Sequence, residues 1–110
     1  MAFEAKYVGD GVFIDYTPSV AVVAGQVIEQ VNLIGVANTP ISANILGSLA
    51  VEGVFDFAKT ASLVVNVGDL VYWDDTLNEA NKTLTSNVYI GKCVKASAAA
   101  DTTVRVKLDQ

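Results

Sequence analysis

The residue types that most often carry enzyme chemistry are scarce in this chain. It has no histidine, which excludes a Ser-His-Asp triad, a Cys-His pair, an imidazole base and any zinc site with histidine ligands. Its one cysteine, Cys93, lies in a strand-like run from Val88 to Ala96, and we interpret it as a small core residue rather than a nucleophile. A single cysteine also excludes an internal disulfide, as expected of a protein assembled in a reducing cytosol.

Acidic residues and glycines supply the remaining candidates for chemistry. Asp69, Asp74 and Asp75 form a cluster, but a calcium loop needs alternating oxygen ligands and a turn glycine, so we interpret these residues as solvated turns. No Gly-x-x-x-x-Gly-Lys-Ser/Thr phosphate loop occurs, because Gly91-Lys92 sits inside a strand-like run. We therefore predict a protein that is not an enzyme, with no catalytic residue, no metal site and no cofactor.

The composition limits the partners that the chain can bind. Seven basic residues against 12 acidic residues give a net charge of −5, the wrong sign for binding nucleic acid or an anionic membrane. The mean hydropathy is +0.42, but polar residues and glycines interrupt the uncharged run from Gln30 to Val51, so it is not a membrane span. No apolar leader segment is visible at the start. The apolar residues, 52% of the chain, must be buried within the domain or against other proteins.

Apolar residues recur with a period near two, which predicts an all-β fold. Thr103 to Asp109 and Val51 to Phe57 each alternate between an apolar and a polar face, whereas both faces of Leu70 to Trp73 are apolar, so we expect that strand to be covered on both sides. Only Ala58 to Val65 is a possible helix, and its β-branched residues argue against one. The remaining strand candidates are Val12 to Tyr16, Val20 to Val23, Val27 to Val31, Leu33 to Ala37, Ile45 to Ala50 and Val88 to Ala96.

These strands are expected to form one small β-barrel or sandwich over residues 12–110. Antiparallel pairing should bring Glu52 and Asp56 onto the same face as Arg105 and Lys107. One core cluster should contain Phe55, Phe57, Val104, Val106 and Leu108, joined by Ile90 and by Leu70 or Tyr72.

Residues 1–11 are expected to form an N-terminal arm. Phe3, Ala5 and Tyr7 alternate with Glu4 and Lys6, and Gly9 and Gly11 form a hinge. The segment is either an edge strand of the domain or an arm that adds to the sheet of a neighbouring subunit.

A faint internal repeat divides the chain into two halves. Ala24-Gly25-Gln26-Val27-Ile28 resembles Val67-Gly68-Asp69-Leu70-Val71, and Leu33-Ile34-Gly35 resembles Tyr89-Ile90-Gly91. A polar stretch from Asp74 to Asn87 is present only in the second half. Either the chain contains a structural duplication, or the similarity arises by chance in a sequence rich in valine and glycine.

Tyr72 and Trp73 are the most prominent aromatic pair. A stacking platform for nucleic acid needs basic neighbours, but Asp74 and Asp75 follow. We interpret Trp73 as an anchor in the core or in a subunit interface. The alternative is a non-catalytic carbohydrate- or receptor-binding β-module that uses Tyr72, Trp73 and Tyr89.

Several blocks together resemble the capsid cement, or head decoration, proteins of tailed phages, which are often labelled as a domain of unknown function or as RecA-like recombinases. The most specific are Glu52-Gly53-Val54-Phe55 and the run from Gly68 to Asp74, and the resemblance extends from about Gly9 onward. The recombinase label is contradicted by the missing phosphate loop and the short chain. Further blocks are Gly25-Gln26-Val27, Leu33 to Ala37, Ile90-Gly91 and Thr103 to Leu108.

The resemblance implies a small β-barrel-like protein, made in the host bacterial cytoplasm, that docks on the outer surface of the expanded capsid and bridges major capsid protein subunits. It also implies a homo-trimer, with a monomer in solution as the alternative. The resemblance transfers no catalytic or binding residue. We expect contacts with the capsid or a sister subunit at Phe3, Ala5 and Tyr7 of the arm and at Tyr72 and Trp73.

Overall fold

The computed structural model of the chain describes residues 4–110, and these residues form strands and turns without a helix. The all-β prediction is therefore confirmed. None of the described residues belongs to a helix that could cross a membrane. The strands are β1 (Phe13–Tyr16), β2 (Val27–Gln30), β3 (Leu33–Val36), β4 (Gly47–Ala50), β5 (Glu52–Ala58), β6 (Leu70–Asp74), β7 (Glu79–Asn81), β8 (Val88–Lys95) and β9 (Thr103–Asp109).

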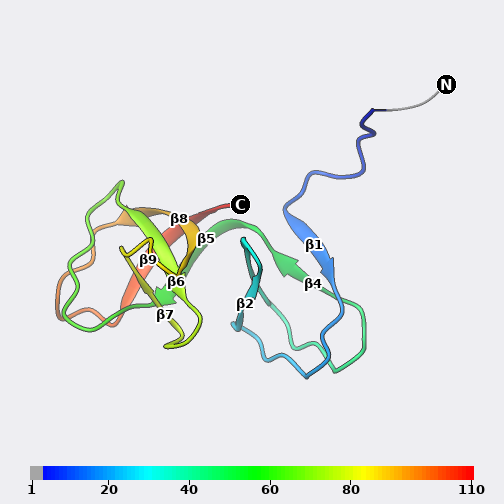
Figure 1. The fold of residues 1–110 in the computed structure, drawn as a ribbon, viewed down its shortest axis with the longest axis horizontal. Coiled ribbons are helices and arrows are strands. Elements are labelled where there is room, and N and C mark those ends of the chain that lie inside the picture. The colour runs from blue at the N-terminus through cyan, green and yellow to red at the C-terminus, as the bar shows by residue number, and fades with distance from the viewer. Residues whose placement is uncertain (1–3) are drawn as a thin grey trace.

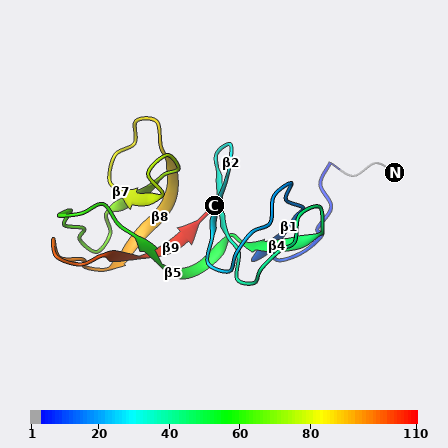
Figure 2. The same ribbon diagram turned by 90° about the horizontal axis from the view of Figure 1, so that it is seen from below.

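These strands make two antiparallel sheets that lie along the long axis of the molecule (Figures 1 and 2). Within residues 4–110, the four-stranded sheet has the order β1-β4-β3-β2 and the five-stranded sheet the order β5-β9-β8-β6-β7. Neither sheet closes into a barrel. Of the two predicted architectures, a barrel or a sandwich, the structure therefore agrees with the sandwich, in which two open sheets pack together. The segment from Val20 to Val23 makes only an isolated bridge, from Val22 to Ile41, and β7 has no counterpart among the predicted strands.

A shared apolar core joins the two sheets. The four-stranded sheet has a small apolar cluster of its own, but Ile34 and Val36 of β3 do not belong to it. They pack with the buried residues of the five-stranded sheet. The backbone N–H of Ile34 also donates to Oε1 of Gln110 at 2.7 Å, while Nε2 of Gln110 donates to the carbonyl of Ile90 at 2.6 Å. The main cluster contains Ile34, Val36, Phe57, Val65, Val71, Trp73, Ala80, Ile90, Cys93, Val104, Val106 and Leu108.

The predicted core is confirmed for β9 and corrected for β6. Phe57, Ile90 and the three apolar residues of β9 are buried, and Phe55 is half-buried against them. However, Val71 and Trp73 point into the core, not Leu70 or Tyr72, and Leu70 is 46% exposed. The expectation that this strand is covered on both sides is wrong because none of the described segments packs over the outer face of the five-stranded sheet.

The topology confirms the internal duplication. In the order of each sheet, β1, β4, β3 and β2 correspond to β5, β9, β8 and β6, and β7 is an addition to the second half. The addition lies in the polar stretch from Asp74 to Asn87 that lengthens the second copy. Chance similarity would not reproduce the same strand order twice.

The matching turns also share their hydrogen bonds. Gly25 and Gly68 both adopt left-handed backbone angles, with φ of 85° and 91°, which glycine accepts without a steric cost. The N–H of Gly25 donates to the carbonyl of Ala37 at 2.6 Å, and the N–H of Gly68 donates to the carbonyl of Cys93 at 2.8 Å. In each turn the side chain that follows the glycine, Gln26 or Asp69, accepts from a backbone N–H three residues earlier.

The described part of the N-terminal segment, residues 4–11, contains no strand and extends away from both sheets (Figure 1). Tyr7 is 76% exposed, and its hydroxyl donates to Oδ1 of Asp10, which raises the pKa of Tyr7. The backbone joins the sheet only near Val12, whose carbonyl accepts from the N–H of Val51 at 3.0 Å. Residues 4–11 therefore do not form an edge strand of the domain, which was one of the two interpretations of this segment.

Replacing Phe57 by alanine should destabilise the domain by about 3–5 kcal/mol, because the ring is buried and packs edge-on against Trp73 with a centroid distance of 6.0 Å. The matched control is Val54→Ala on the opposite face of the same strand, where the side chain is 54% exposed and the expected change is about 0.5 kcal/mol or less. Urea unfolding of both variants measures the difference. Equal losses would contradict the assignment of the two faces of β5.

Candidate interaction surfaces

The outer face of the five-stranded sheet carries a row of four exposed side chains in register. Leu70 of β6 lies opposite Lys92 of β8, Lys92 lies opposite Lys107 of β9, and Lys107 lies opposite Val54 of β5. We call these four residues the basic row. Like charges directly opposite each other destabilise a sheet, and among residues 4–110 no carboxylate forms an ion pair with Lys92 or Lys107. The row is a basic strip with an apolar residue at each end.

The neighbouring positions on the same face are better balanced. As predicted, β5 and β9 place Asp56 opposite Arg105, with Nε of Arg105 3.0 Å from Oδ1 of Asp56. Hydrogen bonding to Arg105 lowers the pKa of Asp56, and the charge of Lys95 adds to this effect. Because both partners of this ion pair are nearly half exposed, the pair contributes little to stability, but it neutralises Arg105.

Aromatic residues on the other side of the basic row do not form the single surface of Tyr72, Trp73 and Tyr89 that the alternative binding module requires. Tyr72 and Tyr89 make an edge-on pair with a centroid distance of 5.8 Å. The Tyr89 hydroxyl donates to Oδ2 of Asp109 at 3.2 Å; burial first and Asp109 next raise the pKa of Tyr89. Trp73 points to the opposite face of β6, where it is 4% exposed and donates from Nε1 to Oδ1 of Asp75 at 3.1 Å.

The prediction that Trp73 contacts the capsid or a sister subunit is therefore corrected, since its indole is buried in the core of its own chain. Its interpretation as a core anchor applies instead. Ala5, Tyr7 and Tyr72 retain surface that a partner can reach. Phe3, which completes the predicted contact set, lies outside the described residues.

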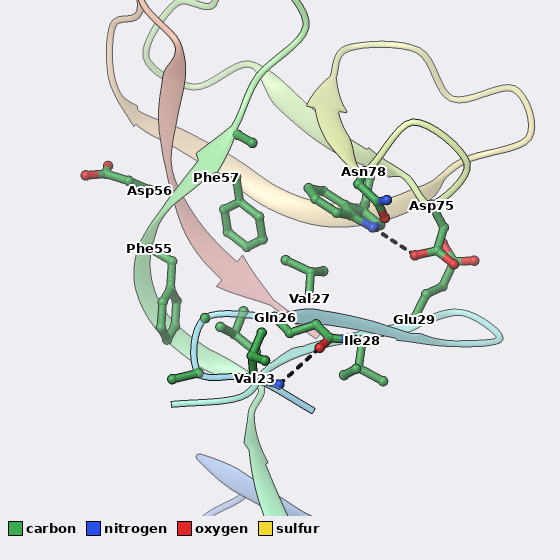
Figure 3. Close-up of a pocket in the computed structure, with 15 residues that line it drawn as sticks. Val23, Gln26, Val27, Ile28, Glu29, Phe55, Asp56, Phe57, Asp75 and Asn78 are labelled. Atoms are coloured by element: carbon green, nitrogen blue, oxygen red, sulfur yellow. Dashed lines mark hydrogen bonds between the residues drawn. The ribbon is translucent and has the colours of Figure 1, made fainter. Parts of the chain in front are cut away.

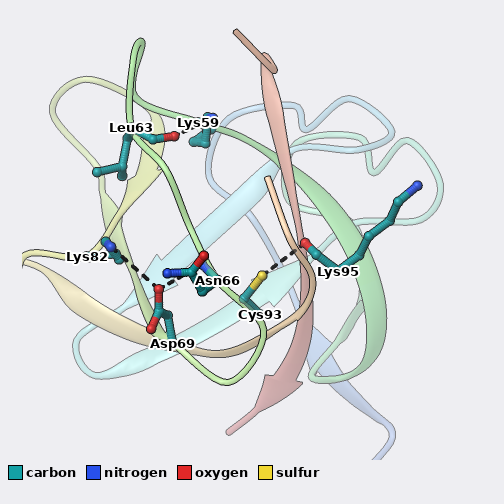
Figure 4. A network of polar contacts seen from close by, with 7 residues as sticks. All are labelled: Lys59, Leu63, Asn66, Asp69, Lys82, Cys93 and Lys95. Carbon is teal, nitrogen blue, oxygen red and sulfur yellow. Dashed lines mark hydrogen bonds and ion pairs between the residues drawn. The ribbon is translucent and has the colours of Figure 1, made fainter. Parts of the chain in front are cut away.

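The residues considered for chemistry have structural roles (Figure 4). Cys93 is 1% exposed, and its Sγ donates to the carbonyl of Lys95 at 3.1 Å, which fits a core residue. Oδ2 of Asp69 accepts from the N–H of Asn66 at 2.8 Å; this bond and the nearby charge of Lys82 lower the pKa of Asp69. Asp74 similarly accepts from two backbone N–H groups in the next turn. Within residues 4–110 no group of three or more carboxylate, thiol or imidazole side chains is placed to hold a metal ion.

Lys59 is a buried cation that sequence reasoning missed. Its Nζ donates to the carbonyls of Leu63 and Ala98, both at 2.6 Å, and to Oγ of Ser97 at 3.0 Å. The three bonds use all three of its N–H groups, so Lys59 joins two loops rather than serving as a base or a nucleophile. A lysine just after a strand gives no sequence signal of such burial.

A groove of about 740 Å³ lies between the two sheets (Figure 3). Val27 of β2 faces Phe55 and Phe57 of β5 across it, and Trp73 forms part of its wall. Glu29 lies at one end, near Asp75. Sequence reasoning could not find this groove because its two sides belong to different sheets.

Replacing Glu29 by glutamine should stabilise the protein at neutral pH. Burial first, and then the charges of Asp75 and Asp74, raise the pKa of Glu29. Stability is therefore lost as the pH rises through the folded-state pKa, because the folded chain holds the proton more tightly than the unfolded chain does. Thermal melts should show a higher Tm for Glu29→Gln at pH 7 and no difference near about pH 3, where Glu29 is protonated in both states. Glu4→Gln in the exposed arm is the control, and a gain that persists at low pH would contradict this origin.

Comparison with known proteins agrees with the resemblance carried by the sequence blocks. A family model described as phage cement protein matches residues 8–108, which include β1 to β8 and all of β9 except Asp109. No curated protein and no solved structure matches the chain. Because the match covers more than half of its length, the chain belongs to the phage cement protein family.

Proposed function

We propose that this protein is a capsid cement protein that binds the outer surface of the expanded head and bridges neighbouring major capsid protein subunits. The observation that carries this proposal is the family match over residues 8–108, and membership of the family implies a structural component of the virion capsid. The protein acts as a homo-trimer on the shell, with a monomer in solution as the alternative, and is made in the host cytoplasm. It is not an enzyme.

The surface chemistry supports a protein partner. The outer face of the five-stranded sheet combines exposed apolar side chains with the uncompensated pair Lys92 and Lys107. A surface with carboxylates flanked by apolar groups would neutralise this pair and cover Leu70 and Val54. We assign the basic row, together with the adjacent Tyr72, to the capsid contact.

The position of Trp73 argues against the alternative function, a carbohydrate- or receptor-binding module. It required Tyr72, Trp73 and Tyr89 on one surface, but Trp73 lies on the buried face of β6. The edge-on pair of Tyr72 and Tyr89 remains as a half-buried aromatic feature beside the basic row.

Adding the protein to expanded shells should raise their melting temperature. A ligand that binds only the expanded shell stabilises each site by about 2.7 kcal/mol at a hundredfold excess over Kd, and many sites act together. Negative-stain images and shell melting with and without the protein measure binding and stabilisation, with unexpanded shells as the control. Absence of binding to expanded shells would overturn the proposed function.

Lys92→Glu should stabilise the free protein and weaken its docking. The change converts a like-charge pair across β8 and β9 into an opposite-charge pair, which is worth about 0.2–1 kcal/mol. Melting of the free variant and its sedimentation with shells measure the two effects separately. The double variant Lys92→Glu/Lys107→Glu restores like charges, so it should lose the stability gain while still docking weakly. Unchanged docking of both variants would exclude the basic row from the capsid contact.

A further inference from the structure

The groove between the sheets is bordered by two sheet edges that carry no partner strand. β2 is the last strand of the four-stranded sheet and β5 the first of the five-stranded sheet, so within residues 4–110 each pairs with a strand on one side only along its own length, and β7 bridges only Lys59, the residue after β5. Residues of both strands line the groove, with Val27 on one side and Phe55 on the other (Figure 3). Unpaired edges of this kind accept an added strand, because its backbone can hydrogen-bond to either edge.

The lining of the groove selects an extended segment with apolar side chains and a positive charge. Val27, Phe55 and Phe57 supply apolar contacts, while Glu29 and Asp75 place carboxylates at one end. A volume of about 740 Å³ is within the range of clefts that bind ligands, and the groove is open enough to admit a backbone.

The N-terminal arm has these properties. Phe3, Ala5 and Tyr7 alternate with Glu4 and Lys6, so an extended arm presents apolar side chains on one face and the charged side chains, Lys6 among them, on the other. Tyr7 and Val8 are exposed in the single chain. Burial in a groove would remove this apolar surface from water.

The arm is directed toward a second copy rather than its own groove. It starts from β1, which lies at the opposite edge of the four-stranded sheet from β2. In both Figure 1 and Figure 2 its described part, residues 4–11, leaves the body on the side remote from the five-stranded sheet. An arm that enters a different surface on its neighbour makes a head-to-tail contact, and such contacts can close into rings.

We propose that residues 1–8 of one copy insert as an added strand into the groove between β2 and β5 of a second copy. This deepens the proposed function, because it rests on the homo-oligomer and identifies the contact that forms it. Insertion of the arms then links the copies, and the basic row remains exposed for contact with the capsid.

Disulfide trapping between two variants tests the insertion. Ala5→Cys supplies a thiol in the arm, and Val23→Cys supplies one at an exposed position that lines the groove. The matched control is Val54→Cys, which is exposed on the outer face of β5, one residue from the groove-lining Phe55. The native Cys93 is buried and should stay unreactive. Mixing Ala5→Cys with Val23→Cys should give at least about ten times more crosslinked dimer than mixing it with Val54→Cys, as measured by mass spectrometry. Equal yields, or no crosslink, would overturn the proposal.

Removal of the arm provides an independent readout. Light scattering at micromolar concentration should show an oligomer for the full chain and a monomer after deletion of Met1 to Val8, with the same circular dichroism spectrum. An oligomer that survives the deletion, a full chain that is monomeric, or a crosslink from Ala5→Cys to the capsid protein instead would overturn the insertion. If crosslinking and arm-dependent assembly occur but shells are not bound, the proposed function fails while this inference stands.

Discussion

Burial of one face of each sheet against a common core is the constraint from which the other features of this molecule follow. Ile34 and Val36 of the four-stranded sheet are packed with Val71, Ile90 and Val106 of the five-stranded sheet. The five-stranded sheet buries only one face in this core, so its outer face, with the basic row, is left to solvent. The edges β2 and β5 remain unpaired for the same reason, because the sheets meet through side chains instead of continuing strand to strand.

The candidate interaction surfaces are therefore a consequence of how the sheets pack. Several charged residues have hydrogen-bond or ion-pair partners within the fold. Lys59 connects two loops, Asp69 accepts a hydrogen bond within a turn, and Asp56 forms an ion pair with Arg105. Lys92 and Lys107 differ, since they oppose each other across two strands without an acidic partner in the described chain. An arrangement that costs the free protein stability is understandable when the counter-charge is supplied by a partner.

The sequence predicted residue burial best in strands that have one buried face and one exposed face. Alternation in β9 and β5 predicted the burial of Val104, Val106 and Phe57 and the facing of Asp56 and Arg105, because a period of two fixes the face of every residue. It failed for β6, where both faces are apolar and the pattern alone cannot distinguish the core face from the outer face, so Leu70 or Tyr72 was expected in the core in place of Val71 and Trp73. The groove and the buried Lys59 were not predictable, because both depend on how segments distant in the sequence meet.

The duplicated strand order has a consequence for how such a protein can arise and diverge. A half-length chain of four strands would have to associate with a second copy to cover the residue equivalent to Ile34, and it would do so only above a threshold concentration. Joining the two units through β4 and β5 makes their association intramolecular, with an effective concentration on the order of millimolar for short flexible connections. Once association no longer depends on identical halves, each can change separately. In the present chain both halves contain the glycine turn, at Gly25 and Gly68, but only the second half contains β7.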